Sequence, residues 1–231
     1  MNIVKVIFHG LVLLMLVACS APMQMQSGWY RGVVRIDGKL DDWDGLWRFP
    51  ENGKLALAAK NDGQDMYLAV KTQDKRIIQN IATSGFEVLI DRKGGQKGRY
   101  RLQFTGNVSP SVYNRMTLST DLHEDMINKA LTQALMGPLK LRSVNYQGNM
   151  QEFTARGSSF SSYKEGEWSC EFKVPMSGLK TMPAPGSKIG VGFSAYPPPP
   201  SPRSITVFQP GPTETIITEW WVKLTLASPP K

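Results

Sequence analysis

Side chains that commonly act in covalent and acid–base catalysis are scarce in this sequence. Its 231 residues include two histidines and two cysteines. His123 is the only histidine after His9, and no serine has the flanking glycines of a nucleophile elbow. A nucleophilic triad needs an acid–base partner beside its nucleophile, and the sequence offers no such pair. We therefore predict that the chain is not an enzyme.

Carboxylates are concentrated in one short stretch that runs from Ile36 to just past Trp43. Its acidic residues are Asp37, Asp41, Asp42 and Asp44. The two carboxylates of a glycosidase flank a bond from separate positions, whereas these lie together in one segment. Gly38 can adopt a positive φ and an aspartate can accept a hydrogen bond from nearby backbone, so we predict a tight turn with Ile36 and Trp43 anchored in the core. A calcium site is the alternative, with oxygen ligands from Asp37, Asp41 and Asp42.

The first residues of the chain have the pattern of a secretory signal. Lys5 precedes an apolar run, Leu11 to Val17, that is too short to span a bilayer. Leu16-Val17-Ala18-Cys19 is similar to a bacterial lipobox, in which the cysteine is acylated and becomes the first mature residue. We therefore predict a signal peptide over 1–18 and a palmitate-bearing lipid anchor at Cys19. Ser20 favours the outer membrane in a Gram-negative cell. Cleavage by an ordinary signal peptidase, which ignores Cys19, is the alternative.

The chain is basic, with 27 lysines and arginines against 19 acidic residues and a net charge of +8. Only Lys5 lies in the predicted signal peptide, so the mature protein stays positive. Such a balance favours anionic partners such as lipid head groups, acidic polysaccharide or nucleic acid. The charges are nevertheless spread along the chain without a lysine–arginine block, which is typical of a solvated surface. We therefore predict no nucleic-acid partner.

Composition and cysteine content indicate a single globular domain. Once Cys19 carries lipid, Cys170 has no partner for an intramolecular disulfide, so the fold must rest on its core. Cys170 falls on the apolar side of the segment 167–175, and we expect a buried, unreactive thiol. Residues 19–30 are small and polar, which predicts a flexible tether. Residues 31–228 are predicted to form the domain.

Most of that domain has the alternation of apolar and polar residues that indicates β-strands. The clearest segments are 66–74, 86–91, 100–104, 167–175, 188–196 and 218–226. Weaker strand patterns cover 54–60, 139–147 and 151–156. Glycines between 91 and 100 indicate a hairpin that joins 86–91 to 100–104. The predicted fold class is all-β, an antiparallel β-sandwich.

One segment has helical spacing instead, since apolar residues recur every three or four positions between 121 and 136. Asp121 and Glu124 fit a capping box and Gly137-Pro138 fits a helix end, which together predict an inserted amphipathic helix. The strand 188–196 has a face with almost no side chains, because Gly190 and Gly192 occupy it. We expect the helix to cover this face. A ligand lying on it is the alternative.

Strand phase also identifies an aromatic residue that the core does not require. In 218–226, Trp220 is expected to point inward and Trp221 outward. Trp221 is therefore the first candidate for a ligand-binding aromatic, because sugar rings stack on exposed aromatic faces. Trp47 and Tyr196 are its candidate companions. The alternative places Trp221 beneath the helix or beneath a proline-rich loop.

The order of these patterns resembles the family 9 carbohydrate-binding modules (CBM9) and the related DOMON-like β-sandwiches. The matching segments are Ile36-Asp37-Gly38 to Trp43, Asp65 to Asp74, Phe86 to Asp91, Trp168 to Pro175 and Ile189 to Phe193. The resemblance implies a sugar-binding sandwich, with Glu87 and Asp91 as further candidate ligand residues. Sugar-binding members of the family have a Gln-Asp or Asn-Asp pair just before the strand that corresponds to Phe86 to Asp91. In this sequence Ala82-Thr83-Ser84-Gly85 stands there instead.

These observations predict a membrane-anchored, non-catalytic lipoprotein that binds polysaccharide or glycan at the cell envelope. One alternative is an envelope adaptor that docks on another protein through the same sandwich. The other is a haem-binding module of the DOMON type, with His123 and either Met116 or Met126 as ligands. Apart from these alternatives, no cofactor is expected.

Overall fold

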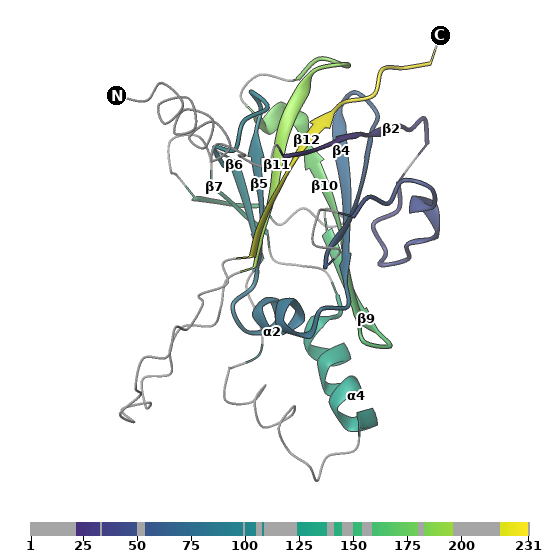
Figure 1. Ribbon diagram of the computed structural model, residues 1–231, viewed down its shortest axis with the longest axis vertical. Coiled ribbons are helices and arrows are strands. Elements are labelled where there is room, and N and C mark those ends of the chain that lie inside the picture. Colours follow the sequence, from purple (N-terminus) through teal and green to yellow (C-terminus); the bar gives the residue numbers. More distant parts are fainter. Residues whose placement is uncertain are drawn as a thin grey trace, which may run out of the picture.

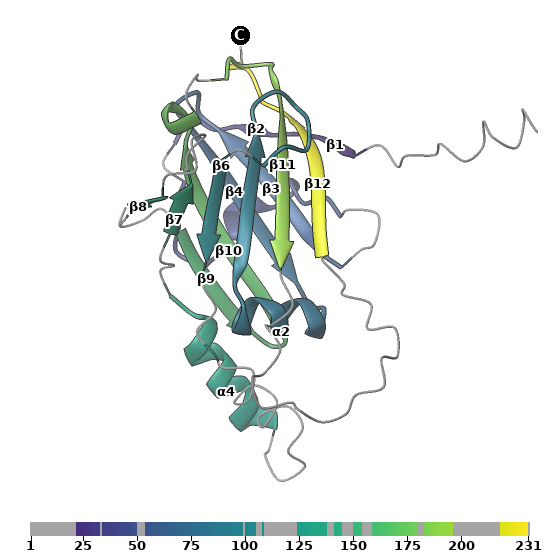
Figure 2. The ribbon, with the colours of Figure 1, turned by 90° about the vertical axis from the view of Figure 1, so that its left-hand side faces the viewer.

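The computed structural model describes residues 22–32, 34–49, 54–98, 100–104, 108, 124–137, 141–144, 150–153, 159–179, 183–195 and 218–230. Over these residues the chain forms two β-sheets that pack face to face, and two helices lie at one end of the pair (Figure 1, Figure 2). The predicted β-sandwich is confirmed.

One sheet has seven strands in the order β1-β12-β11-β5-β6-β7-β8. Their bounds are β1 Met23–Gln26, β12 Thr218–Thr225, β11 Lys188–Ala195, β5 Phe86–Asp91, β6 Tyr100–Phe104, β7 Leu141–Val144 and β8 Met150–Phe153. Neighbouring strands are antiparallel except for β1, which runs parallel to β12. The predicted hairpin is confirmed as β5 and β6.

The other sheet has five strands in the order β2-β3-β4-β10-β9. Their bounds are β2 Gly28–Trp29, β3 Ala56–Asn61, β4 Asp65–Thr72, β10 Glu167–Pro175 and β9 Ser159–Lys164. Here too the pairing is antiparallel apart from the first strand, since β2 runs parallel to β3. The chain thus enters each sheet through a short parallel edge strand.

Apolar strand faces fill the space between the sheets. On β10, Trp168 and Cys170 are 0% exposed and Phe172 is 1% exposed. The ring of Phe86 on β5 meets Trp168 edge-on, with centroids 5.4 Å apart, and stacks on Phe193 of β11 at 5.8 Å. Such pairs add to the stability that burial alone provides. The predicted burial of Cys170 is confirmed, and burial raises the pKa of its thiol well above the ordinary value.

The helix predicted for 121–136 is confirmed as α4, Glu124–Leu135, but its predicted position is wrong. It packs on β9, where Gly137 and Ser161 exchange backbone hydrogen bonds of 2.9 and 3.0 Å and Thr132 Oγ1 donates to the carbonyl of Tyr163 at 3.3 Å. It therefore closes one end of the sandwich and does not cover the glycine-lined face of β11. Asp121 lies outside the described residues.

A second helix, α2 (Lys75–Thr83), has no counterpart among the sequence predictions. Asp74 caps it, because its Oδ1 accepts from the backbone N–H groups of Arg76 at 2.9 Å and Ile77 at 3.2 Å. Ile77 and Ile81 are buried against the sandwich core. Two short 3₁₀ helices, η1 Asp41–Trp43 and η2 Met176–Leu179, complete the helical elements described. No helix within the described part of the chain is both long and apolar enough to cross a membrane.

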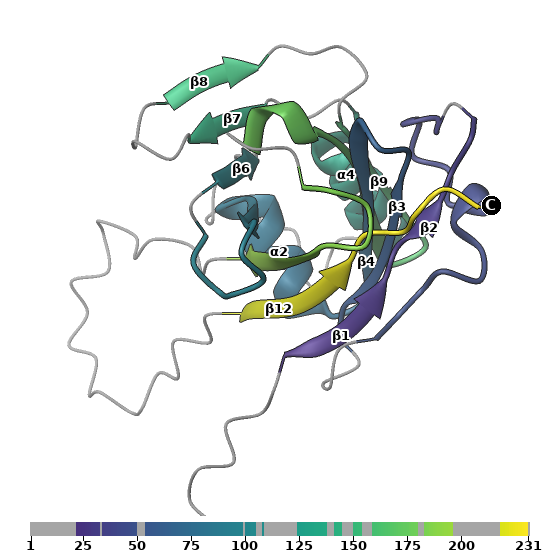
Figure 3. The ribbon, with the colours of Figure 1, turned by 90° about the horizontal axis from the view of Figure 1, so that it is seen from above.

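The predicted flexible tether over 19–30 is wrong for the residues of β1 and β2. Residues 23–29 form β1 and β2, and the chain passes from the edge of one sheet to the edge of the other (Figure 3). At the crossing, Ser27 Oγ donates to Asn61 Oδ1, and the backbone N–H of Ala227 donates to Asn61 Oδ1 at 2.9 Å. This buried polar network joins the first strands to the end of β12. The small, polar composition of this segment predicted a tether, but backbone pairing with β12 and β3 makes it part of the two sheets.

Candidate functional site

Trp221 lies on the outer face of the seven-stranded sheet, as strand phase predicted. Along β12, Trp220 and Val222 are buried, whereas Trp221 and Lys223 are partly exposed. Trp221 pairs with Gly192 of β11, and a Cβ on that glycine would lie 2.8 to 2.9 Å from atoms of the indole. The indole therefore rests on the backbone of Gly192, so the glycine face is covered by this ring and not by α4.

The β5–β6 turn, residues 92–98, folds over the same face. A Cβ on Gly190 would lie 1.9 Å from the carbonyl oxygen of Gly95, so the turn touches the sheet at this second glycine. Asp91 holds the turn in place, because its two carboxylate oxygens accept from the backbone N–H groups of Lys93 and Lys97, both at 2.9 Å. As a candidate ligand residue, Asp91 is thus engaged in building the turn beside Trp221.

Polar groups of β5, β6 and β11 share the outer face of the sheet with the indole. Glu87 is 6% exposed and accepts a hydrogen bond from the side-chain amide of Gln103. Ser194 pairs with Glu87 across β11 and β5, and its buried Oγ has no hydrogen-bond partner among the described groups. Gln103 is half-buried and Arg101 is exposed. A molecule arriving on this face would therefore meet Trp221, Gln103 and Arg101 before it met Glu87.

The Asp-rich turn lies on the other side of the molecule, against the outer face of the five-stranded sheet (Figure 1). The buried indole of Trp43 donates to Glu171 Oε1 at 2.7 Å, and the backbone N–H groups of Asp37 and Gly38 donate to Glu171 Oε2 at 3.1 and 2.5 Å. Burial raises the pKa of Glu171 above its ordinary value, although these hydrogen bonds act in the opposite direction. The predicted anchoring is confirmed for Trp43, while Ile36 is only partly buried.

Lys60 of β3 lies beneath the same turn. Its ammonium is 4.7 Å from the ring centroid of Tyr30, 4.8 Å from that of Trp43 and 3.8 Å from Asp42 Oδ2. Burial lowers the pKa of Lys60 below its ordinary value, although the charges of Asp42 and Glu171 oppose the change. Cation–π contacts and an ion pair thus fix the turn to the sheet.

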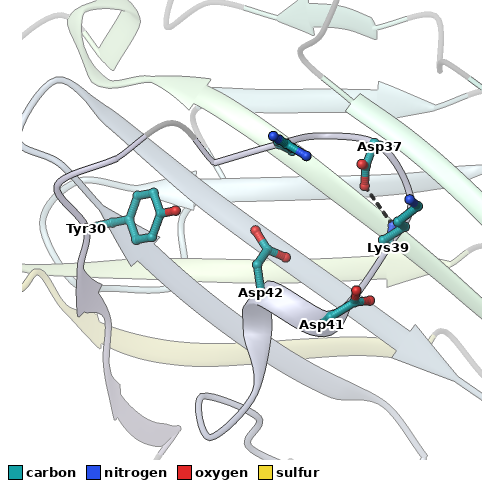
Figure 4. A pocket seen from close by; sticks show the side chains of 6 residues that line it. Tyr30, Asp37, Lys39, Asp41 and Asp42 are labelled. Carbon is teal, nitrogen blue, oxygen red and sulfur yellow. Dashed lines mark hydrogen bonds between the residues drawn. The ribbon is translucent and has the colours of Figure 1, made fainter.

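An open hollow of about 570 Å³ lies beside the turn (Figure 4). The residues that line it are Tyr30, Arg35, Asp37, Lys39, Asp41 and Asp42. Asp37 Oδ1 accepts from the backbone N–H of Lys39 at 3.0 Å, which confirms the predicted turn geometry. Across the described ranges, no group of three or more His, Cys, Asp or Glu side chains is placed to hold a metal ion.

Two of the remaining candidate residues lie away from Trp221 in the described part of the chain. Trp47 lies on the outer face of the five-stranded sheet, with its ring centroid 4.9 Å from the ammonium of Lys71. It and Trp221 are on opposite faces of the sandwich and cannot contact one ligand together. Met126, a candidate haem ligand, is 58% exposed on α4. Four predicted residues lie outside the described part of the chain: Cys19, Met116, His123 and Tyr196.

Sequence reasoning did not find Glu171 or Lys60. Strand phase places Glu171 correctly on the side of β10 away from Cys170, but that side is covered by the Asp-rich turn. A buried indole needs a hydrogen-bond acceptor, and the carboxylate within the segment Trp168–Pro175 was the available signal. Lys60 gave no such signal, because its aromatic and acidic neighbours come from a separate segment.

Comparison with known proteins gives similarities of fold. No protein-family model and no curated protein matches the chain. A CBM9 module from Caldicellulosiruptor kristjanssonii in complex with glucose is similar in structure, with 10% identity and a TM-score of 0.39, over 90% of this chain and 98% of that one. A CBM9 module from the same organism in complex with cellotriose has 12% sequence identity and a TM-score of 0.38, over 88% of this chain and 95% of that one. A protein from Bacteroides uniformis has 9% sequence identity and a TM-score of 0.39, over 88% of this chain and 100% of that one.

Proposed function

We propose that this chain is a membrane-anchored, non-catalytic lipoprotein whose β-sandwich binds polysaccharide or glycan at the cell envelope. The observation that carries the proposal is Trp221, a partly exposed indole on the outer face of the seven-stranded sheet. Burial in the core does not account for its position, because the core face of β12 is formed by its neighbours Trp220 and Val222. An indole that packs on a sheet and stays partly exposed can stack on the apolar face of a sugar ring.

The surroundings of Trp221 suit a polyhydroxylated ligand. Arg101 and the side-chain amide of Gln103 offer hydrogen-bond donors on β6, and Glu87 orients that amide. Stacking on one ring with a few polar groups beside it is the usual composition of a small-ligand site. The anchor belongs to the same proposal, since acylation of Cys19 would hold this sandwich at a membrane surface.

Substitution of Trp221 tests the glycan-binding part. Trp221→Ala should weaken binding to a glycan array by tenfold or more, which corresponds to about 1.4 kcal/mol. The melting temperature should fall by only a few degrees, because a partly exposed ring is removed and no cavity forms in the core. Binding is measured on the array and unfolding by circular dichroism.

Trp47→Ala is the matched control, because it removes a partly exposed tryptophan from the opposite face. It should leave glycan binding unchanged. A large fall in the melting temperature of Trp221→Ala would show that this indole is part of the sheet's structure and that the site is misplaced. Absence of any glycan bound by the unsubstituted protein would contradict the proposal itself.

A further inference from the structure

The outer face of the seven-stranded sheet gathers positive charge next to Trp221. The residues concerned, called here the basic cluster, are Arg92, Lys93, Lys97, Arg101, Lys188 and Lys223. The first three belong to the β5–β6 turn and the others to β6, β11 and β12. A Cβ on Gly94 of the turn would lie 3.2 Å from the carbonyl oxygen of Lys188 and 3.5 Å from Cε of Lys223. Segments far apart in sequence thus meet at this turn.

The two glycines of β11 explain why the turn and the indole are neighbours. Gly190 lets the turn backbone touch the sheet at Gly95, and Gly192 lets the indole of Trp221 do the same. Positions two apart on a strand lie on one face, about 6.6 Å from each other. Lys223 likewise follows Trp221 on the same face of β12. The basic cluster and the aromatic surface are therefore continuous.

The four lysines of the cluster are not neutralised by ion pairs within the described residues. Lys93, Lys97 and Lys188 are exposed, and no ion pair involves them or Lys223 in the described part of the chain. The nearby carboxylate of Asp91 is bound to the backbone of the turn. Such a surface attracts anions, and the attraction falls with ionic strength.

We propose that the ligand of this face is an acidic polysaccharide, with sugar rings stacked on Trp221 and carboxylate groups held by the basic cluster. This inference rests on the proposed glycan-binding function and specifies its ligand class. Arg101 lies in the same cross-strand row as Trp221, separated from it by Gly192 and Leu89, and Lys223 follows Trp221 on the same face of β12. A neutral glycan would make no use of these charges.

The experiment compares two forms of one polymer. The chain from Ser20 to Lys231, which contains every residue that the structure describes, is assayed for binding to polygalacturonate and to its methyl-esterified form, in which the carboxylates are neutral. Polygalacturonate should bind at least tenfold more tightly, and this preference should shrink as salt is raised. Equal affinity for both polymers would overturn the acidic ligand class and leave the glycan-binding proposal standing.

Charge substitutions locate the site. The triple variant Lys93→Glu/Lys97→Glu/Lys188→Glu should weaken binding to polygalacturonate about tenfold or more. The matched control is Lys39→Glu/Lys75→Glu/Lys164→Glu, which makes the same change in net charge at exposed positions elsewhere. Equal loss in both triple variants would show an effect of net charge alone and would overturn the site. If the first variant unfolds, the milder Lys93→Gln/Lys97→Gln/Lys188→Gln variant replaces it.

A membrane surface is the competing anionic partner. Vesicles of phosphatidylcholine mixed with phosphatidylglycerol are therefore assayed beside vesicles of phosphatidylcholine alone. Cluster-dependent binding to the anionic vesicles, together with no binding to polygalacturonate, would overturn the proposal in favour of lipid head groups. Binding to polygalacturonate that is sensitive to both Trp221→Ala and the first triple variant would support it.

Discussion

Glu171 shows how one residue connects the two parts of the molecule that the sequence presents separately. Its carboxylate, on β10, accepts three hydrogen bonds from the Asp-rich turn, two from backbone N–H groups and one from the indole of Trp43. A carboxylate can accept all three because its two oxygens offer about four lone-pair sites. Its side chain is 0% exposed, so these bonds replace the water that ionisation would otherwise require.

Glu171→Gln should destabilise the fold by about 1–3 kcal/mol, because an amide places N–H donors against N–H donors. The loss should depend on pH. The folded-state pKa of Glu171 is raised above its ordinary value of 4.5, so its contribution to stability is full below that value and decreases as pH rises through the folded pKa. The free energy of unfolding in urea should therefore differ more between the two proteins at about pH 4 than at about pH 8.

Glu165→Gln is the control for that titration, because the side chain of Glu165 is 83% exposed. It should show no comparable dependence on pH. A Glu171→Gln penalty that grows from acid to neutral pH would mean that the folded-state pKa is lowered, contrary to what burial requires.

At the scale of elements, the two glycines of β11 determine what packs on the outer face of its sheet. Its inward side chains, Ile189, Val191 and Phe193, are buried in the core, while Gly190 and Gly192 leave the other side bare. Glycine weakens a strand by its conformational entropy and by the absence of a packing side chain. Here the turn and the indole supply that packing from the neighbouring strands.

Gly190→Ala should displace the β5–β6 turn, because the new Cβ would lie 1.9 Å from the backbone oxygen of Gly95. We expect a loss of about 1–3 kcal/mol in stability and faster hydrogen exchange of the amides at 92–98. Gly192→Ala is the matched comparison, since its Cβ meets the side chain of Trp221, which can rotate away. It should change the indole fluorescence and leave exchange in the turn unaltered. Unaltered exchange in both variants would contradict the contact at Gly95.

The same elements show how far sequence patterns reach. Alternation gave the strands and the inward faces, as in β10 and β12, because burial on one side imposes a period of two. The apolar spacing predicted which residues form α4 but not where the helix packs, since an apolar stripe does not specify the surface that it contacts. Sequence patterns did not predict α2, a short helix next to strands. They also did not predict β1 and β2, which form strands because they pair with β12 and β3.

For the whole molecule, the distribution of charge could not be predicted from the order of residues. The sequence shows cations spread without a block, yet Lys188 and Lys223 join the β5–β6 turn through the pairing of β5, β11 and β12. The aspartates of the Asp-rich turn lie on the other sheet. The Asp-rich turn and the basic cluster therefore lie on opposite faces of the sandwich. The same pairing places Trp47 and Trp221 on opposite faces, which no single-strand pattern could reveal.

The position of β1 also determines what a lipid at Cys19 would do to the whole protein. Three residues separate Cys19 from Met23, the first residue of β1, so the anchor lies within about 14 Å of the sheet edge even if that segment is fully extended. Acylation would therefore hold the β1 edge of the sandwich close to the bilayer. A lipid anchor at Cys19 would thus constrain the orientation of the protein as well as its location.

Cys19→Ala should release the protein from membranes or leave it as uncleaved precursor, because Cys19 is the only thiol in the lipobox-like segment. The measurement is membrane fractionation, with the mass of the mature chain as a second readout. High-salt washing separates the two modes of attachment, since it removes protein held by the basic cluster but not protein held by acyl chains. Cys170→Ala is the control, because that buried thiol should have no part in anchoring. Normal processing and unchanged, salt-resistant membrane association of Cys19→Ala would contradict the lipid anchor.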